Sequence, residues 1–524
     1  MKKLISGLFT FNIAIILILL FFFKKTTDYY IKRVFMLDDP FLGVISLLVF
    51  VTVFIVIVFF EKPVRSFLEQ NSKWLFPLSL IMLFVFEIVF VRSGFFYSDW
   101  DPAAVLAGAF SLFEGVPEDV GTSYFSAHPN NLMLVFIYYK VLLLLSPFFN
   151  GLSIWPVAYF QCLIFTLSGA LVYSISKKLS GDLITAWITY MLYILAVGTS
   201  PWLIITYSDE TGLIFPLIIF SIWLSSAAYG SDVPDKYKLM ILYFVIGAVS
   251  YFGYSLKPQI IITTIAVLMT DIFGSLKDKR SPIHVLIHKI LPCIAGMIAL
   301  NLIISYLLIP SMQIELNKNE AFPMTHYFMM GLNSETDGVY ADADGAFTNS
   351  FEDPVEKRGA NIRVAFQRIK DYGLKGLAEH LAKKTMVNFG DGTFAYGIDG
   401  NFFAGKESGS FPVAEETLLT PLINRYILPD GSRFETASAF RHGLWLLLLM
   451  LCLLTGIVFT LRKYGLEMSS TGIMALQLSL LGLTMFELLF EAKARYLFIY
   501  LPFFILTSGI GLAFIKDRLL KLRK

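Results

Sequence analysis

Charged residues and cysteine are both scarce in this sequence. Charged residues occupy only 16% of the 524 positions, whereas hydrophobic residues occupy 56%, and the mean hydropathy is +0.67. Such a composition lies outside the range of soluble globular domains. The formal net charge of +2 argues against a nucleic-acid partner, because phosphate backbones require a concentrated basic surface. The composition therefore predicts a protein that has the lipid bilayer as its solvent.

The three cysteines lack the spacing of a metal site. Cys162, Cys293 and Cys452 each lie within apolar sequence, far from one another. Paired cysteines at short spacing would be expected for zinc or redox chemistry. We interpret all three as small core residues.

Long apolar segments are abundant. A helix needs roughly 20 apolar residues to cross the hydrocarbon core. Twelve segments are interpreted as spans: residues 4–23, 41–60, 74–94, 154–176, 183–200, 211–229, 239–256, 258–273, 288–309, 441–461, 467–489 and 496–515. The first has a basic start, but it is too long for a signal peptide and lacks a small-residue cleavage site. The sequence predicts an all-α polytopic membrane protein with about 12 transmembrane helices.

Residues 131–147 form a further apolar segment that carries Lys140 near its middle. A lysine at the bilayer centre costs roughly 2.5–3.5 kcal/mol on insertion scales, so we expect an interfacial helix here. Leaving this segment out of the spans keeps Lys177, Lys178 and the tail KDRLLKLRK on the same face as the amino terminus. By the positive-inside rule this predicts a multi-pass cell membrane protein with both termini cytoplasmic.

Two long segments are predicted on the extracytoplasmic face, where loops of this length usually carry function or a fold of their own. The first is the outer loop 95–153, which includes interfacial helices. The second contains apolar residues at helical spacing in 354–371 and 374–387, followed by a loop-like run at 389–405. The predicted organisation is therefore N-terminal transmembrane helices in 1–73, a transmembrane core in 74–309, a small α-rich extracytoplasmic domain in 311–440 and C-terminal transmembrane helices in 441–524.

Acidic residues gather on this outer face. Asp99 and Asp101 follow the third predicted span, and Asp209 and Glu210 follow the fifth. Asp101 precedes Pro102 and an apolar helical run, so we interpret it as a helix N-cap. That leaves Asp99 as the candidate general base, with a solvated loop acid as the alternative. Asp209 has helix capping as its alternative.

Cationic residues lie at the same boundary. Lys257 and Pro258 occupy a short turn between the seventh and eighth spans, and Lys493, Arg495 and Tyr496 precede the last span. A fixed cation at headgroup depth suits an anionic phosphate, and arginine can bind phosphate oxygens in a bidentate manner. The alternative for Lys257 is snorkelling to the headgroups.

The order of these motifs resembles the GT-C superfamily of polytopic glycosyltransferases. The closest likeness is to the protein-mannosyltransferase and aminoarabinose-transferase branch (family 39-like), which uses polyprenyl-phosphate sugars. The motifs that carry the resemblance are YSDWD, His128-Pro129, SKKLSG, TYSDETG, LKPQ and ARYLFIYLP. They cover roughly residues 75–275 and 490–505. A histidine before a helix is equally typical of a cap or surface residue.

The resemblance implies a GT-C fold with a catalytic core in residues 74–309 and a membrane glycosyltransferase activity. A sugar would pass by inverting displacement from a polyprenyl-phosphate donor to an extracytoplasmic acceptor, which would be a cell-surface glycan, a teichoic-acid-like polymer or a protein. The first-loop acid of the family corresponds to the catalytic base, which here is Asp99 or Asp101. Trp100 separates these two aspartates, whereas the family's acidic pair is adjacent. The expected substrate-binding residues are His128, Asp209, Glu210, Lys257, Pro258, Lys493, Arg495 and Tyr496. No cofactor is implied, and a divalent cation is the less favoured alternative.

Two other functions are alternatives for a polytopic, aromatic-rich sequence of this kind. A flippase or exporter of lipid-linked glycans would place ionisable residues within the spans, and Glu87 and Glu487 are the main residues of that kind. A glycan polymerase would use a lipid diphosphate oligosaccharide instead of a lipid monophosphate sugar.

Overall fold

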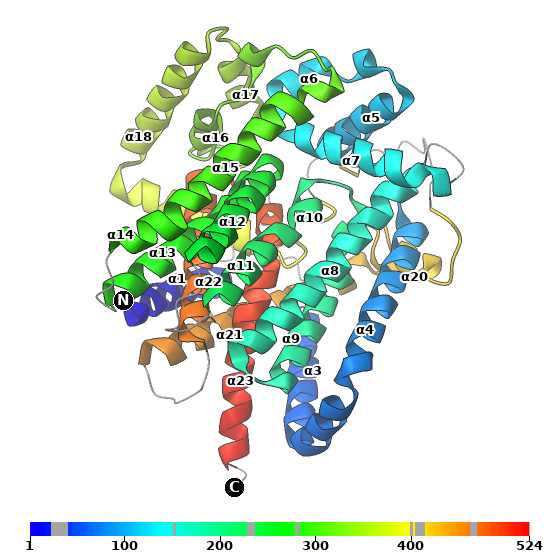
Figure 1. The fold of residues 1–524 in the computed structure, drawn as a ribbon, viewed down its shortest axis with the longest axis vertical. Coiled ribbons are helices and arrows are strands. Elements are labelled where there is room, and N and C mark those ends of the chain that lie inside the picture. The colour runs from blue at the N-terminus through cyan, green and yellow to red at the C-terminus, as the bar shows by residue number, and fades with distance from the viewer. Residues whose placement is uncertain are drawn as a thin grey trace.

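The computed structural model describes most of the chain: residues 1–22, 40–149, 153–227, 236–277, 282–398, 402–403, 414–461 and 469–522. Within these ranges the chain is helical and contains no β-strand (Figure 1). The prediction of an all-α polytopic membrane protein is confirmed. Eleven helical segments of the described residues are long and apolar enough to cross a membrane.

Where the chain is described, the twelve predicted spans are mostly helical. The helices that form or adjoin them are α1 (Lys2–Phe22), α3 (Pro40–Phe59), α4 (Glu61–Gly94), α8 (Trp155–Ser180), α9 (Leu183–Tyr193), α10 (Ser208–Gly212), α11 (Ile214–Ala227), α12 (Lys236–Leu256), α13 (Ile261–Lys277), α14 (Pro282–Val285), α15 (Leu291–Ile303), α21 (Phe434–Leu461), α22 (Ser470–Leu489) and α23 (Leu501–Leu522). Leu48–Phe59 and Leu183–Gly198 are apolar helices shorter than the others.

Shorter 3₁₀ and π-helical turns extend or join these helices. They are η1 (Pro117–Asp119), η2 (Pro129–Asn131), η3 (Ser146–Phe148), η4 (Ile194–Gly198), η5 (Pro201–Ile204), η6 (Pro258–Ile260), η7 (Leu286–Ile290), η8 (Ile304–Leu308), η9 (Pro310–Met312), η10 (Lys318–Glu320) and η11 (Ala494–Tyr500). Several of them, such as η6 and η11, lie next to the ends of the long apolar helices.

Close backbone packing holds the helices together. A Cβ atom added to Gly247 of α12 would lie 1.8 Å from the carbonyl oxygen of Cys293, and one added to Gly296 of α15 would lie 2.0 Å from that of Phe244. Small residues at such crossings are typical of membrane helices, which lack a hydrophobic force between them. Cys162, Cys293 and Cys452 are all buried, as predicted.

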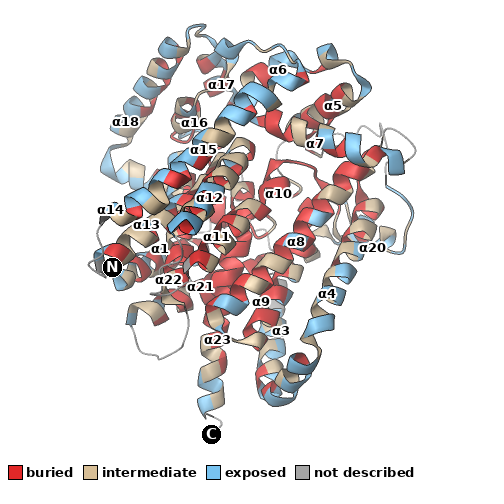
Figure 2. Cartoon of the chain, in the orientation of Figure 1, coloured by how far each residue is buried: buried red, intermediate tan, exposed pale blue. Residues whose placement is uncertain are grey.

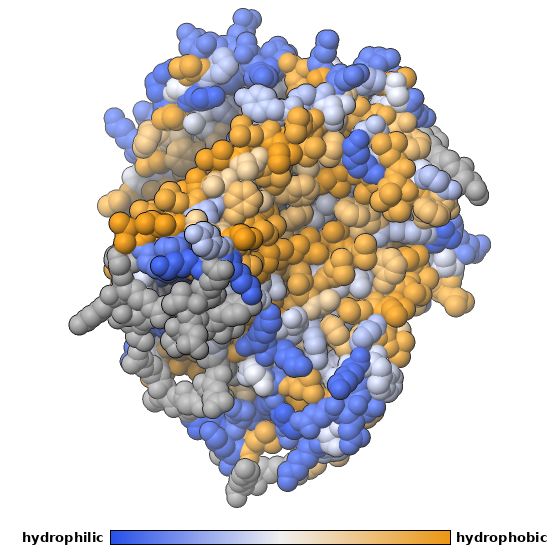
Figure 3. Space-filling model, in the orientation of Figure 1, coloured by the Kyte–Doolittle hydropathy of each residue, from blue (hydrophilic) through white to orange (hydrophobic). Residues whose placement is uncertain are grey.

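The surface matches immersion in a bilayer. Buried residues concentrate in the interior of the helix bundle (Figure 2). An apolar band crosses the middle of the visible face, with hydrophilic surface above and below it (Figure 3). Large apolar side chains such as Val53, Met82 and Ile241 are more than half exposed. A soluble protein would not expose a band of this kind, whereas lipid tails cover it.

The helices outside the predicted spans are α5 (Trp100–Glu114), α6 (Thr122–Ala127), α7 (Leu132–Leu145), α16 (Met324–Met330), α17 (Asp342–Asn349), α18 (Pro354–Phe389) and α20 (Thr420–Tyr426). Most of them lie together at the top of the molecule in Figure 1. As predicted, a helix break occurs at Gly373, which has a φ of +58° inside α18. Residues 390–398, after the end of α18, form a bend and turns, which agrees with the loop prediction where the chain is described.

The predicted interfacial segment forms η2, α7 and η3. Its range Pro129–Phe148 is apolar and long enough to span. However, α7 packs against α5 and lies across the upper end of α8 (Figure 1). The Lys140 ammonium lies 4.4 Å from the centre of the Tyr139 ring. The orientation of α7 therefore favours the predicted interfacial position, which stays a prediction.

Candidate functional site

The two aspartates that follow α4 have different surroundings. Asp99 is exposed, and its carboxylate accepts a hydrogen bond from the backbone N–H of Trp100 (2.8 Å). Asp99 is therefore the N-cap of α5, and the predicted capping role of Asp101 is wrong. Pro102 suggested a start at the wrong residue, because the helix already includes Trp100.

Asp101 is instead enclosed by hydroxyl groups. Its two carboxylate oxygens accept hydrogen bonds from Tyr124 (2.7 Å) and Tyr207 (2.9 Å), and Asn131 donates in turn to the Tyr124 hydroxyl (2.6 Å). Burial raises the pKa of Asp101, but the Tyr124 hydrogen bond and the charge of Arg495 outweigh burial, so this pKa lies below its ordinary value. Asp101 is therefore held as a carboxylate.

A second acid brings two distant cations together. Lys257 Nζ lies 2.9 Å from the Asp209 carboxylate, and Arg495 Nε lies 3.2 Å from Asp209 Oδ2. The three residues come from the first turn of α10, the turn before η6 and the start of η11. All three are almost fully buried: the side-chain exposure is 0% for Asp209, 3% for Arg495 and 12% for Lys257. We call these three residues the outer triad.

Aromatic rings cover the cations of the outer triad. The Arg495 guanidinium carbon lies 4.6 Å from the Phe402 ring centre and 5.1 Å from that of Tyr207. Lys257 Nζ lies 4.6 Å from the Tyr496 ring centre and 5.6 Å from that of Tyr207. Cation–π contacts of this kind stabilise a charge without using its N–H donors. Because Tyr207 also donates to Asp101, it links both parts of the site.

Glu210 follows Asp209 and is completely buried. Neither of its carboxylate oxygens has a hydrogen-bond partner among the described residues. Such a group is rare in folded proteins and usually has a functional or solvent-related reason. Glu491 accepts a hydrogen bond from the Tyr496 hydroxyl (2.9 Å). Glu491, Tyr207 and Phe402 were not predicted as site residues, although Tyr207 lies within the TYSDETG motif.

The remaining predicted residues lie at the edge of this cluster. The His128 ring packs 5.0 Å from Tyr124 and 5.3 Å from Phe322, and burial lowers its pKa although Asp101 opposes the shift. Pro258 opens η6, and Lys493 precedes η11 as its N-cap residue. These two residues therefore lie at the two turns that supply Lys257 and Arg495.

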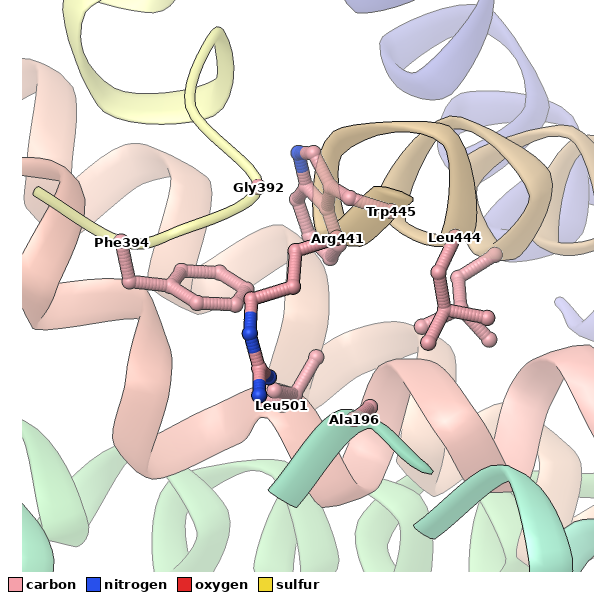
Figure 4. A pocket seen from close by; sticks show the side chains of 8 residues that line it. Ala196, Gly392, Phe394, Arg441, Leu444, Trp445 and Leu501 are labelled. Atoms are coloured by element: carbon pink, nitrogen blue, oxygen red, sulfur yellow. The ribbon is translucent and has the colours of Figure 1, made fainter. Parts of the chain in front are cut away.

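An apolar cavity lies elsewhere in the protein (Figure 4). Its lining includes Ala196, Phe394, Arg441, Trp445 and Leu501, and none of the predicted site residues. The guanidinium of Arg441 donates to the carbonyl oxygen of Thr199. We therefore place the candidate site at the charged cluster and not at this cavity.

The DxD-like spacing of the first-loop acids raised the alternative of a divalent cation. Asp99 is an exposed helix cap, while Asp101 is engaged by two tyrosines, so the two carboxylates have separate surroundings. No group of three or more His, Cys, Asp or Glu residues suited to a metal ion occurs in the described part of the chain.

The fold and this cluster define a class: a polytopic α-helical membrane protein with buried, partly paired charges where its spans meet the outer helices. The model of a family described as conserved hypothetical integral membrane protein matches residues 1–513, and the chain belongs to this family. No match is found among curated proteins or among solved structures.

Proposed function

We propose that this protein is a GT-C type glycosyltransferase of the cell membrane. It transfers a sugar from a polyprenyl-phosphate donor to an extracytoplasmic acceptor. The observation that carries the proposal is the convergence of Lys257 and Arg495 on Asp209, next to the Asp101 carboxylate. A glycosyl transfer from a lipid phosphate requires cations for the departing phosphate and a carboxylate for the acceptor.

The outer triad suits a phosphodiester. Two positive charges, Lys257 and Arg495, and one negative charge, Asp209, sum to +1, and the neighbouring Asp101 carboxylate brings this sum to zero. A polyprenyl-phosphate sugar would add one negative charge on its phosphodiester. A lipid diphosphate, as a polymerase would use, would add more negative charge to the same buried site, which is less favourable. The charge of the site therefore supports a lipid monophosphate donor over a lipid diphosphate.

Asp101 is the candidate base that the geometry favours over Asp99. Its lowered pKa keeps it ionised, and Tyr207 connects it to the cations. In the proposed inverting step, the acceptor hydroxyl gives its proton to Asp101 and its oxygen attacks the anomeric carbon. The bond between that carbon and the phosphate oxygen breaks, and its electron pair stays on the phosphate. Lys257 and Arg495 stabilise the charge that grows there.

The test is turnover by the purified protein in lipid nanodiscs with a panel of polyprenyl-monophosphate sugars. We expect polyprenyl phosphate to be released from one donor. Asp101→Asn should reduce the rate by roughly 100-fold or more, which is the range of general base catalysis, and Lys257→Ala should chiefly weaken donor binding. If Asp99→Asn abolishes release while Asp101→Asn does not, Asp99 is the base. If no donor releases polyprenyl phosphate, the proposed glycosyltransferase activity is contradicted.

A flippase or exporter is the second candidate. Glu87 of α4 and Glu487 of α22 are both fully buried, and one carboxylate oxygen of each has no hydrogen-bond partner among the described residues. Buried acids within spans are typical of transport pathways. Proteoliposomes that move a fluorescent lipid-linked glycan across the bilayer without releasing polyprenyl phosphate would favour this candidate. Loss of that movement in Glu87→Gln would assign the pathway.

A further inference from the structure

Two aromatic residues beside the candidate site remain almost half exposed. Trp100 follows the third span and Tyr340 belongs to the extracytoplasmic domain, yet their ring centres lie 6.5 Å apart with the planes at 68°. Their exposed fractions are 45% and 43%. Exposed aromatic pairs from separate parts of a chain have little reason to meet for stability alone, because their rings bury little area.

Trp100 is also held in an unfavourable backbone conformation. Its φ is +59°, a region that a bulky residue rarely adopts. A left-handed conformation costs roughly 1–2 kcal/mol for a residue with a side chain. In a buried residue, packing of the ring could offset this strain, but the Trp100 ring is almost half exposed. Strained residues cluster at ligand sites, where the strain fixes a side chain in a working position.

Hydrogen-bond acceptors surround the pair. Asp99 is the exposed neighbour of Trp100, and the Asp342 carboxylate lies near enough to Tyr340 to raise its pKa. Burial raises the pKa of Tyr340, and the nearby charges of Asp342, Glu491 and Asp101 raise it further. Tyr340 therefore lies within electrostatic reach of the Asp101 carboxylate, where the acceptor hydroxyl would be activated.

We infer that Trp100 and Tyr340 form the platform that binds a neutral saccharide as the sugar acceptor. This inference rests on the proposed function, because it names the acceptor for the same site. The apolar C–H face of a sugar ring packs on an aromatic face, while its hydroxyl groups donate to carboxylates. The carboxylates near the pair would repel a phosphate-bearing polymer, and they offer only acceptors to its phosphates. A neutral glycan therefore fits better than a teichoic-acid-like polymer.

A polypeptide is the competing acceptor, and the experiment separates the two. Saturation-transfer NMR on the full-length protein in nanodiscs would use a panel of neutral oligosaccharides and a serine- and threonine-rich peptide as probes. We expect an oligosaccharide to bind, Trp100→Ala and Tyr340→Ala each to weaken it at least fivefold, and Trp100→Phe to retain most of the binding. The control is Phe366→Ala, which removes an exposed ring (62% exposed) elsewhere in the same domain.

The outcomes distinguish the platform from the enzyme. If oligosaccharide binding is unchanged in Trp100→Ala and Tyr340→Ala, if no oligosaccharide binds, or if only the peptide binds, the platform is overturned. Donor turnover is measured separately as release of polyprenyl phosphate. Turnover together with any of these three results would keep the proposed function and discard the platform. Saccharide binding through the two rings without turnover would keep the platform as a binding site and discard the enzyme.

Discussion

Two carboxylates of the described residues, Asp209 and Asp182, each contact two cations, and they lie in different parts of the bundle. In the outer triad, Asp209 of α10 contacts Lys257 and Arg495. Asp182, between the end of α8 and the start of α9, contacts Arg65 (2.7 Å) and Lys516. We call this second group the lower triad. Both triads join segments that are distant in the sequence.

The two triads differ in how fully the carboxylate is used. Asp182 also accepts hydrogen bonds from the backbone N–H (2.9 Å) and the hydroxyl (2.6 Å) of Thr185, as the N-cap of α9. Burial raises its pKa, but hydrogen bonds from Lys516 and Thr185 lower it well below the usual range. Asp209 has no such capping role, and its neighbour Glu210 is unpaired among the described residues. Asp182, whose oxygens accept several hydrogen bonds, holds helices together. The outer triad has fewer hydrogen bonds to its carboxylate and is the better candidate for binding a ligand.

The largest effect should come from removing the acid of each triad. Asp209→Asn removes the carboxylate that directly contacts two almost fully buried cations, so we expect a loss of about 3–5 kcal/mol in the free energy of unfolding. Donor turnover should fall at least 100-fold. Asp182→Asn should destabilise the protein less, because the Asp182 side chain is 18% exposed. Donor turnover by this variant should stay near that of the wild type below the unfolding temperature. Steric trapping in bicelles would measure stability.

Equal losses of turnover in both variants, at temperatures where both are folded, would remove the functional distinction between the triads. Asp209→Glu is the matched control, because it keeps the charge and moves it by one methylene group. It should recover most of the stability but only part of the turnover.

A second large effect is expected where α18 meets the end of α22. Lys384 Nζ donates to the carbonyl oxygens of Gly331 (2.8 Å), Leu488 (2.9 Å) and Phe490 (2.5 Å). Burial lowers the Lys384 pKa to about 7. Lys384→Met should cost about 3 kcal/mol, because buried carbonyl groups lose their donor. It should also weaken donor binding, since the segment after Phe490 leads to Arg495.

Hydrogen exchange of residues 490–500 would measure this loosening directly. The control is Lys383→Met, whose side chain is 37% exposed and pairs with Asp337 (3.2 Å). It should change stability by less than about 1 kcal/mol, as exposed ion pairs do. Unchanged exchange in Lys384→Met would show that the domain needs no such link.

Sequence reasoning predicted much of this architecture, because a span requires only length and apolarity. The same reasoning placed Asp209, Lys257 and Arg495 at the ends of spans on one face. It could not bring them into contact, since their meeting depends on how α10, η6 and η11 pack. The helix start at Trp100 was missed because a proline at the third residue of a helix gives the same signal as one at the first.

The environment of Asp101 could not be predicted for a similar reason. Its partners Tyr124 and Tyr207 lie 23 and 106 residues away, and tyrosine is frequent throughout the chain. Phe402 covers Arg495 from a glycine-rich run in which no periodicity indicates direction. Residues in turns obtain their contacts from the helices around them, so local pattern carries little information about them.

Acid should loosen the packing of α16 and α17 before it affects the lower triad. His326 is 2% exposed and hydrogen-bonds through Nδ1 to Thr348 (2.8 Å), and burial lowers its pKa to about 4. The unfolded chain binds this proton near pH 6.5, so stability falls between pH 6.5 and 4, on the order of 2 kcal/mol by pH 5. Asp182, with its lowered pKa, loses stability only below about pH 4.

Thermal unfolding at pH 7 and pH 5 would measure this difference. His326→Gln should remove most of the change between the two pH values, because glutamine can bond Thr348 without titrating. If the variant keeps the full pH dependence, the titrating group lies elsewhere, and burial of the neighbouring His128 and His380 would be the next to test.

The smallest effect should come from the most exposed member of the lower triad. Arg65 is 33% exposed, and it pairs with Glu61 (2.6 Å) as well as Asp182. Arg65→Met keeps the length of the side chain, and Lys516 still neutralises Asp182, so the loss should be below about 1 kcal/mol. Arg495→Met in the outer triad should lower donor affinity at least tenfold, because Lys257 alone cannot bind a phosphate in a bidentate manner. A similar loss of affinity in Arg65→Met would mean that both triads act on the donor, and the comparison between them would fail.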